Sequence, residues 1–160
     1  PLQEGGKLSA ANASQICDGA AAVMIVNAHT CKRLGLTPLA KIVAMSVVGT
    51  DPVIMLEGPI KATEQVLKKA GLKLDDIDLV EINEAFGSVP LAWVRALNAD
   101  MDKLNVNGGS ISIGHPFGMT GSRMVGHLLI EGRRRKAKYG VVTMCIGGGM
   151  GAAGLFEVNS

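Results

Sequence analysis

Residues 141–158 read VVTMCIGGGMGAAGLFEV, and this stretch decides the fold. The apolar, β-branched run at 141–146 is typical of a strand that is buried on both faces. Glycines at 147–149 follow it, and a second apolar run at 155–158 predicts a last strand after the glycine-rich segment. The end of the chain therefore indicates a buried sheet rather than a helical bundle.

Strands and helices alternate along the rest of the chain. Apolar runs predict further strands at 19–26, 41–48 and 77–82. Apolar residues at helical spacing predict helices at 59–70, 85–97 and 120–136, and a short helix passes through Cys31 and Leu34. Pro59 suits a first helical position and Gly71 a helix end. This order is typical of an α/β layered domain, and it predicts a mixed sheet of about five strands covered by helices.

Length and composition limit the classes of protein that remain. The 160 residues are 48% hydrophobic and 19% charged, with a formal net charge of +2. They can form one domain with a proper core, and we expect a single domain over residues 1–160. The small net charge gives no electrostatic case for nucleic-acid binding. No apolar run approaches the roughly 18 residues of a membrane span, and the polar start is unlike a signal peptide.

The cysteine pattern indicates a reducing environment. Cys17, Cys31 and Cys145 are odd in number and far apart, so a disulfide framework is not expected. We expect a cytoplasmic protein, or one from another reducing compartment such as the mitochondrial matrix or the peroxisome. The sequence contains no CxxC or HExxH motif, so we expect no metal.

Two stretches could bind phosphate. Residues 149–154 match the pattern GxGxxG, but a strand follows them instead of the helix that a dinucleotide site requires. The basic run 133–138 ends a predicted helix, where cations favour the helix dipole. It is either a solvated helix end or a docking site for a phosphorylated ligand.

Three residues have the chemistry and the setting of catalytic groups. His115 lies between glycines and directly before Pro116, in a turn with few side chains to obstruct a substrate, and histidine is the commonest general base. Cys145 ends a strand beside glycine N–H groups, which suits a base or nucleophile next to an oxyanion site. Asn83 either caps a helix or holds its amide at the carboxyl end of a strand, where α/β sheets place ligand sites.

The order of several motifs along the chain resembles the thiolase family, the acetyl-CoA acetyltransferases and 3-ketoacyl-CoA thiolases. The resemblance covers residues 7–158. It rests on Ala11-Asn12-Ala13-Ser14, Asp18-Gly19-Ala20-Ala21, Asn83-Glu84-Ala85-Phe86, Asn105-Val106-Asn107-Gly108-Gly109, Gly114-His115-Pro116-Phe117-Gly118 and Cys145-Ile146-Gly147-Gly148-Gly149-Met150-Gly151.

The resemblance implies a role for each matching residue. His115 would activate the nucleophilic cysteine and donate into the first oxyanion hole, and Asn83 would hold the water that completes that hole. Cys145 would be the second catalytic cysteine, the acid/base at the α-carbon of the acetyl group, and the N–H of Gly147 would belong to the second oxyanion hole. Ser14 matches a position that touches the pantetheine of coenzyme A, and Met55 and Phe86 match positions that line the acyl pocket.

The resemblance also implies the reaction and the partners. The reaction is acyl transfer between coenzyme A thioesters, by Claisen condensation of acetyl-CoA or thiolytic cleavage of 3-ketoacyl-CoA, with no permanently bound cofactor. Thiolases carry the acylated cysteine in an N-terminal half, and neither Cys17 nor Cys31 lies in such a context. We therefore expect a C-terminal half that is inactive alone and requires its N-terminal half, in a homodimer or homotetramer.

Three other classes remain as alternatives. One is a non-catalytic thiolase-like protein that binds coenzyme A or lipid, although His115, Asn83 and Cys145 are all present. Another is a ketoacyl-synthase relative, which shares the fold but normally places two histidines beside its cysteine. The third is an interaction domain without catalysis.

Overall fold

The computed structural model describes residues 1–159 and contains one mixed sheet of four strands in the order β1-β4-β3-β2. The strands are β1 (Ala40–Gly49), β2 (Leu79–Ile82), β3 (Tyr139–Ile146) and β4 (Met150–Val158). Strand β2 pairs parallel to β3, whereas β4 runs antiparallel to both β3 and β1. The parallel pair matters most for function, because both of its strands end at the same edge of the sheet.

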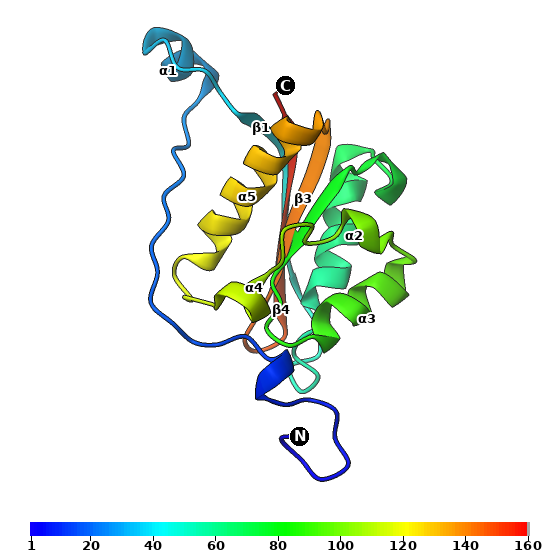
Figure 1. The fold of residues 1–160 in the computed structure, drawn as a ribbon. Coiled ribbons are helices and arrows are strands. Elements are labelled where there is room, and N and C mark those ends of the chain that lie inside the picture. Colours follow the sequence, from blue (N-terminus) through cyan, green and yellow to red (C-terminus); the bar gives the residue numbers. More distant parts are fainter. Residues whose placement is uncertain (160) are drawn as a thin grey trace.

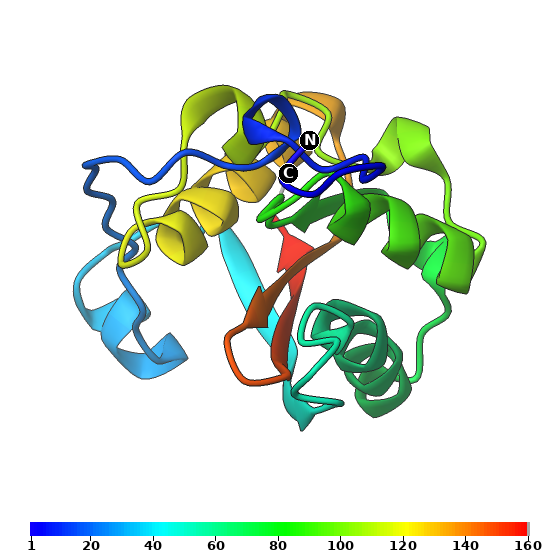
Figure 2. The same ribbon diagram turned by 90° about the horizontal axis from the view of Figure 1, so that it is seen from below.

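Helices cover both faces of the sheet (Figure 1). Helices α2 (Gly58–Ala70) and α3 (Ser88–Leu97) pack on one face, and α5 (Thr120–Arg135) packs on the other. Figure 2 shows the same sandwich from below, with the sheet between the two groups of helices. Two short helices complete the fold, α1 (Ala28–Arg33) and α4 (Ser110–Ile113), together with 3-10 turns at Ala10–Asn12, Leu74–Asp76 and Met101–Lys103.

Alternating side chains divide the core into two layers. Because successive strand residues point to opposite faces, Val80 joins the α2–α3 layer and its neighbour Leu79 joins the α5 layer. The same division separates Val141 from Val142 and Leu155 from Phe156. The α2–α3 layer is built around the buried residues Ala62, Val66, Ile82 and Trp93, and the α5 layer around Met124, Leu128 and Leu129.

The long helices begin and end at the residues expected from their local chemistry. Pro59 occupies the first turn of α2, and Gly71 ends this helix in the left-handed conformation. Helix α5 ends in a basic last turn, Arg133–Arg135, which complements the negative end of the helix dipole.

The predicted strand at 19–26 is wrong, and the sheet has four strands instead of about five. The segment is extended without a strand partner, and Met24 and Ile25 are 77% and 74% exposed. Figure 1 shows it crossing to α1 well away from the sheet. An apolar run becomes a strand only where a sheet edge offers its N–H and C=O groups, and none lies beside this segment.

Two predicted boundaries also shift. Strand β4 begins at Met150 rather than at residue 155, because Met150 and the small residues 151–154 pair with β1 on one side and β3 on the other. Glycine and alanine are poor strand formers, so their sequence does not reveal this pairing. Helix α3 begins at Ser88 rather than at residue 85, and residues 83–87 form a turn that belongs to the candidate site.

Candidate active site

Asn83 and Cys145 lie at the carboxyl ends of the two parallel strands, β2 and β3. The backbone N–H of Asn83 donates to the carbonyl of Thr143 at 3.1 Å, which extends the β2–β3 ladder by one step beyond Ile82. Cys145 lies two residues after Thr143 on β3. The sheet therefore places both predicted residues at one edge, which Figure 1 shows beside α4.

The Asn83 side chain faces two other residues of this edge and does not cap a helix. Asn83 is 1% exposed, and Ser110 Oγ donates to its Oδ1 at 2.7 Å. With Oδ1 engaged, the Nδ2 amide points to Nε2 of His115 at 3.4 Å. Helix α3 begins five residues later without a side-chain cap, so the capping hypothesis for Asn83 is excluded.

His115 is held in one tautomer by its other neighbour. Thr120 Oγ1 donates to the carbonyl of Pro116 at 3.0 Å, and it therefore accepts from the His115 Nδ1–H at 2.6 Å. We assign the unprotonated nitrogen to Nε2, which faces Asn83. Burial lowers the pKa of His115 below its ordinary value of 6.5, and the positive charge of Arg123 lowers it further. The ring is neutral at pH 7 and ready to accept a proton at Nε2.

Glu84 joins the turn after β2 to the loop that carries His115. Its carboxylate accepts from the backbone N–H of Ile111 at 3.1 Å and from Asn105 Nδ2 at 2.8 Å. Gly109 packs so closely on this carboxylate that a Cβ atom there would collide with it. The absence of a side chain at Gly109 is thus a condition for the contact between the two loops.

Cys145 precedes a turn of three glycines, Gly147–Gly149, which connects β3 to β4. Gly148 and Gly149 adopt φ angles of +81° and +83°, a left-handed conformation that favours glycine. Gly147 is exposed. Burial raises the pKa of the Cys145 thiol, so the thiol keeps its proton at neutral pH.

Of the three residues expected to meet substrate, Phe86 lies in the same turn as Asn83, whereas Ser14 and Met55 lie on two other segments. Ser14 contacts the site turn directly, since its N–H and Oγ donate to the carbonyl of Ala85 at 3.0 and 3.2 Å. Phe86 is half-buried and pairs through its backbone with Ala13. Met55 lies in the loop after β1 with a φ of +67°, and no contact described here joins it to Asn83 or His115.

Sequence reasoning missed three residues of this site: Ser110, Thr120 and Arg123. Ser110 and Thr120 are fully buried, and they orient Asn83 and His115 through the hydrogen bonds described above. A serine directly before the Ile-Ser-Ile-Gly-His stretch could have been flagged as a hydrogen-bonding neighbour of the histidine. Nothing in the sequence distinguishes Arg123 from the other basic residues of α5.

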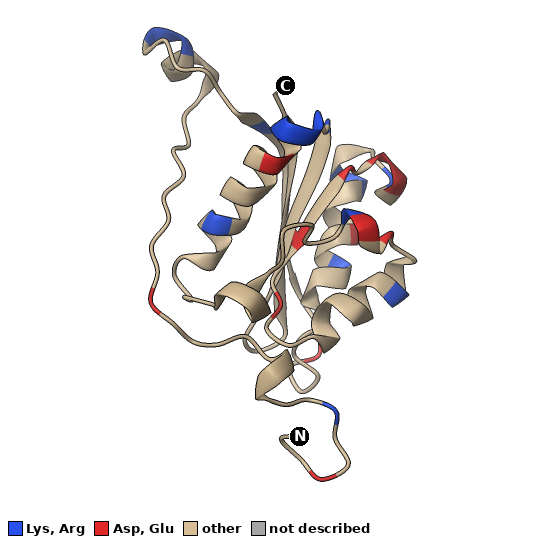
Figure 3. Cartoon of the chain, viewed as in Figure 1, with Lys and Arg blue, Asp and Glu red and all other residues tan. Residues whose placement is uncertain are grey.

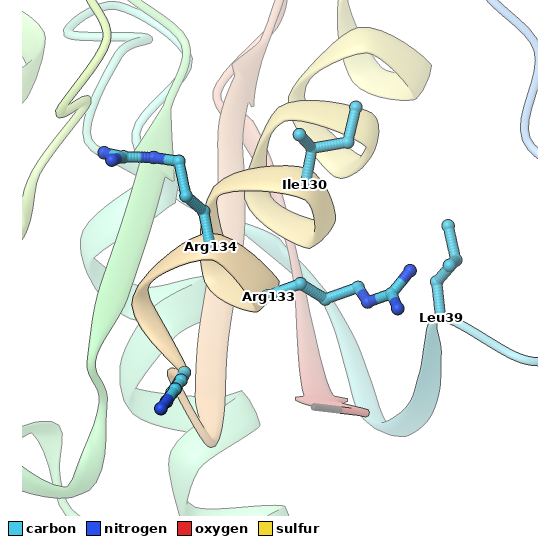
Figure 4. Close-up of a pocket in the computed structure, with 5 residues that line it drawn as sticks. Leu39, Ile130, Arg133 and Arg134 are labelled. Atoms are coloured by element: carbon cyan, nitrogen blue, oxygen red, sulfur yellow. The ribbon is translucent and has the colours of Figure 1, made fainter.

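A cavity lies away from this site, at the carboxyl end of α5. It measures about 560 Å³ and is lined by Leu39, Ile130, Arg133, Arg134 and Lys136 (Figure 4). Arg134 and Arg135 pair with Glu131, whose pKa these hydrogen bonds lower. Figure 3 shows that Lys and Arg gather at this end of α5 and on α1. Both interpretations of the basic run, a solvated helix end and an anion site, remain compatible with this arrangement.

Neither a metal cluster nor a membrane-crossing helix occurs within residues 1–159. The described part of the chain brings no three His, Cys, Asp or Glu side chains together in a way that could hold an ion. Among the same residues, no helix combines the length and the apolar character that crossing a bilayer requires.

The chain is similar in sequence to known proteins. Residues 36–158 match the family model described as "Thiolase, C-terminal domain". The chain is 50% identical over 153 residues to the 3-ketoacyl-CoA thiolase of Bacillus subtilis, covering 96% of this chain and 39% of that protein. It is also 50% identical to the human mitochondrial 3-ketoacyl-CoA thiolase, over 98% of this chain and 39% of the relative.

Solved thiolase structures have the same fold. The Bacillus anthracis acetyl-CoA acetyltransferase superposes with a TM-score of 0.92 at 43% identity, over 95% of this chain and 39% of that one. The human mitochondrial 3-ketoacyl-CoA thiolase in complex with CoA superposes with a TM-score of 0.89 at 46% identity, over 96% and 39%. The chain thus spans about two fifths of the length of these relatives. By sequence and by fold, it belongs to the thiolase family.

Proposed function

We propose that this chain supplies the histidine, the asparagine and the acid/base cysteine of a thiolase that transfers acyl groups between coenzyme A thioesters. The reaction is Claisen condensation of acetyl-CoA in one direction and thiolytic cleavage of 3-ketoacyl-CoA in the other. The observation that carries this proposal is the arrangement of neutral His115, the Asn83 amide and Cys145 at one edge of the sheet. The relatives are named 3-ketoacyl-CoA thiolase and acetyl-CoA acetyltransferase.

His115 acts in the first half of the reaction. Its free Nε2 takes the proton from the nucleophilic cysteine, whose sulfur attacks the thioester carbonyl and forms a tetrahedral oxyanion. The resulting Nε2–H, together with a water held by the Asn83 amide, donates hydrogen bonds to that oxyanion. The lowered pKa of His115 keeps the base form populated at neutral pH, as this step requires.

Cys145 acts at the leaving group and then at the α-carbon. Because burial raises its pKa, the thiol protonates the departing thiolate of coenzyme A and becomes a thiolate itself. That thiolate removes a proton from the α-carbon of the second acetyl-CoA, and the N–H of Gly147 stabilises the enolate oxygen. The enolate carbon attacks the acyl-enzyme carbonyl and the carbon–sulfur bond breaks. The departing cysteine thiolate takes its proton back from His115 Nε2, and the new 3-ketoacyl-CoA is released.

Ser14, Met55 and Phe86 would meet the substrate rather than the reacting atoms. We assign Ser14 to the pantetheine of coenzyme A, and Met55 and Phe86 to the acyl pocket. The hydrogen bonds that join Ser14 to the turn after Asn83 support this assignment. Coenzyme A and its thioesters enter as substrates, and the mechanism uses no resident cofactor or metal.

We further propose that the chain works only together with an N-terminal half that carries the nucleophile. The relatives are much longer than this chain, and the family match begins at residue 36. The exposed apolar segment Gly19–Val26 supports the idea, since a second sheet would give it a strand partner. A homodimer or homotetramer in a reducing compartment fits the family and the three free cysteines.

The test is a thiolysis assay with acetoacetyl-CoA and coenzyme A. The complete polypeptide, in which this chain is joined to its N-terminal half, should cleave acetoacetyl-CoA to two acetyl-CoA. The isolated chain should show no turnover. Cleavage by the pure isolated chain at the rate of the complete enzyme would contradict the need for an N-terminal half. An inactive complete enzyme would contradict the proposed thiolase function.

A further inference from the structure

Ser110 lies between the Asn83 amide and the Arg123 guanidinium. Its hydroxyl donates to Asn83 Oδ1 at 2.7 Å, and the hydroxyl oxygen of Ser110 accepts from Arg123 Nη2 at 3.4 Å. Ser110 is fully buried at the start of α4, whereas Arg123 comes from α5. The hydroxyl therefore connects the helix behind the site to the amide that faces His115.

These contacts form one directed chain of hydrogen bonds. Arg123 can only donate, so Ser110 accepts from it and turns its own proton toward Asn83 Oδ1. Asn83 is thereby held with Nδ2 toward His115 Nε2, and His115 passes its Nδ1–H to Thr120. Every donor in the series points the same way. The Arg123 guanidinium fixes this direction of donation, because it cannot accept a hydrogen bond. Donation in the opposite direction would also require a proton on His115 Nε2.

Arg123 is itself held in a dry and polar setting. Its Nε is buried without a hydrogen-bond partner among the described residues, and its Nη1 lies 3.3 Å from Nδ1 of His127. Its charge acts on the pKa of His115, of His127 on α5 and of Glu81 on β2, and Glu81 in turn feels the charges of Glu84 and Glu131. Glu81 is 4% exposed, and the guanidinium is near enough to favour its ionised form.

We propose that Ser110 and Arg123 are positioning residues that fix the orientation of the Asn83 amide and keep His115 in its neutral, Nε2-unprotonated form. The proposal rests on the proposed function for its catalytic consequence. Neither residue touches the reacting atoms. Ser110 acts through Asn83, and Arg123 acts through Ser110 and through its charge near His115.

The chain offers a matched pair of serines on one short helix. Ser110→Ala removes the hydroxyl that orients Asn83, whereas Ser112→Ala removes a hydroxyl that only donates to the carbonyl of Gly109 at 2.8 Å. In the complete enzyme, Ser110→Ala should lower kcat about ten- to a hundredfold with little change in KM, because the amide loses its fixed direction. Ser112→Ala should retain the kcat of the parent enzyme.

Two substitutions of Arg123 separate its charge from its hydrogen bonds. Arg123→Lys keeps the charge but loses the planar fork, so it should lower kcat and leave the pKa of His115 low. Arg123→Met removes both and should raise the pKa of His115, because the positive charge that helps to lower it is lost. The pKa is measured by NMR of the assembled enzyme with ¹³C-labelled histidine, in which His115→Gln identifies the resonance.

The NMR titration decides the proposal even if the enzyme has no thiolase activity. An inactive parent enzyme would contradict the proposed function, whereas the titration of His115 in the Arg123 variants would still report the electrostatic link. Equal kcat values for Ser110→Ala and Ser112→Ala, or an unchanged His115 pKa in Arg123→Met, would overturn the positioning role. If Ser110→Ala fails to fold, the Arg123 variants decide in its place. Arg123→Lys should then lower kcat while the pKa of His115 stays low, and Arg123→Met should raise that pKa.

Discussion

The carboxylate of Glu84 accepts a hydrogen bond of 3.1 Å from the backbone N–H of Ile111, and this contact ties together the two loops of the site. Glu84 follows Asn83 at the end of β2, and Ile111 lies in α4 just before His115. A bond between these loops fixes the separation of the amide and the imidazole without touching either group. The first prediction concerns this bond.

Glu84→Gln should destabilise the site and lower its activity. The carboxylate accepts from both Asn105 and Ile111, but an amide offers one acceptor and turns an N–H₂ group toward the other donor. We expect a loss of about 1–3 kcal/mol of stability and a lower kcat, measured by thermal unfolding and thiolysis of the complete enzyme. Glu64→Gln, on the exposed face of α2, is the control. An unchanged melting temperature in Glu84→Gln would show that the loops do not depend on this bond.

Cys145→Ala should separate the two halves of the reaction. The nucleophile and His115 remain, so acylation of the complete enzyme by acetyl-CoA should stay measurable by mass spectrometry. Condensation should fall by about 10²–10⁴-fold, because the acid/base at the α-carbon is lost. Cys31→Ala, on α1, should behave like the parent enzyme. Condensation that survives in Cys145→Ala would mean that another group removes the α-proton.

The value of kcat/KM should fall at acidic pH, and this fall should follow the protonation of His115. Its folded pKa lies below 6.5, so the base form persists at neutral pH and kcat/KM falls only as the pH drops through that lowered value. The folded state then binds fewer protons than the unfolded state, so stability is also lost as the pH falls below 6.5. His29→Gln should leave this fall unchanged. A fall centred above 6.5 would contradict the assignment.

Glu81 should make the protein less stable at alkaline pH. Burial raises the pKa of Glu81 from 4.5 to about 7, so the folded state binds the extra proton between these values. This contribution is fully present below pH 4.5 and is lost as the pH rises through 7, by about 3 kcal/mol. Thermal midpoints between pH 5 and 8 should therefore fall more steeply for the parent enzyme than for Glu81→Gln. Parallel curves would show that Glu81 does not titrate in this range.

Hydrogen exchange of residues 19–26 should report the missing strand partner. In the isolated chain these amides have no ladder bonds and should exchange within seconds, at rates close to those of an unfolded peptide. In the complete polypeptide they should become protected, because a sheet of the N-terminal half would pair with them. Continued rapid exchange there would contradict this arrangement, and protection within β4 provides the internal reference.

The α/β class and most of the order of strands and helices were accessible from the sequence. Gly71 and Pro59 marked α2, and the period of the apolar residues marked α5, because local chemistry decides both. The strand predicted at 19–26 failed because no strand within residues 1–159 lies beside this segment. Local pattern does not reveal whether a sheet edge is available.

The arrangement behind the catalytic residues could not be predicted. Ser110, Thr120 and Arg123 become important only when β2, α4 and α5 meet, and their roles are directions of hydrogen bonds rather than residue types. The raised pKa of Cys145 and the lowered pKa of His115 likewise follow from burial. The sequence named the reacting groups, and the packing determines their protonation.

The parallel pairing of β2 with β3 has a kinetic consequence. Between Ile82 and Tyr139 the chain passes through α3, α4 and α5 before the two strands can meet. Closing such a long crossover costs loop entropy before any ladder contact forms, so this pairing is a slow step. During refolding, helical circular dichroism should recover early, and the edge that holds Asn83, His115 and Cys145 should assemble last. An inhibitor that binds this edge would stabilise it only after the helices had formed. Added at that stage of refolding, the inhibitor would speed the appearance of native protein.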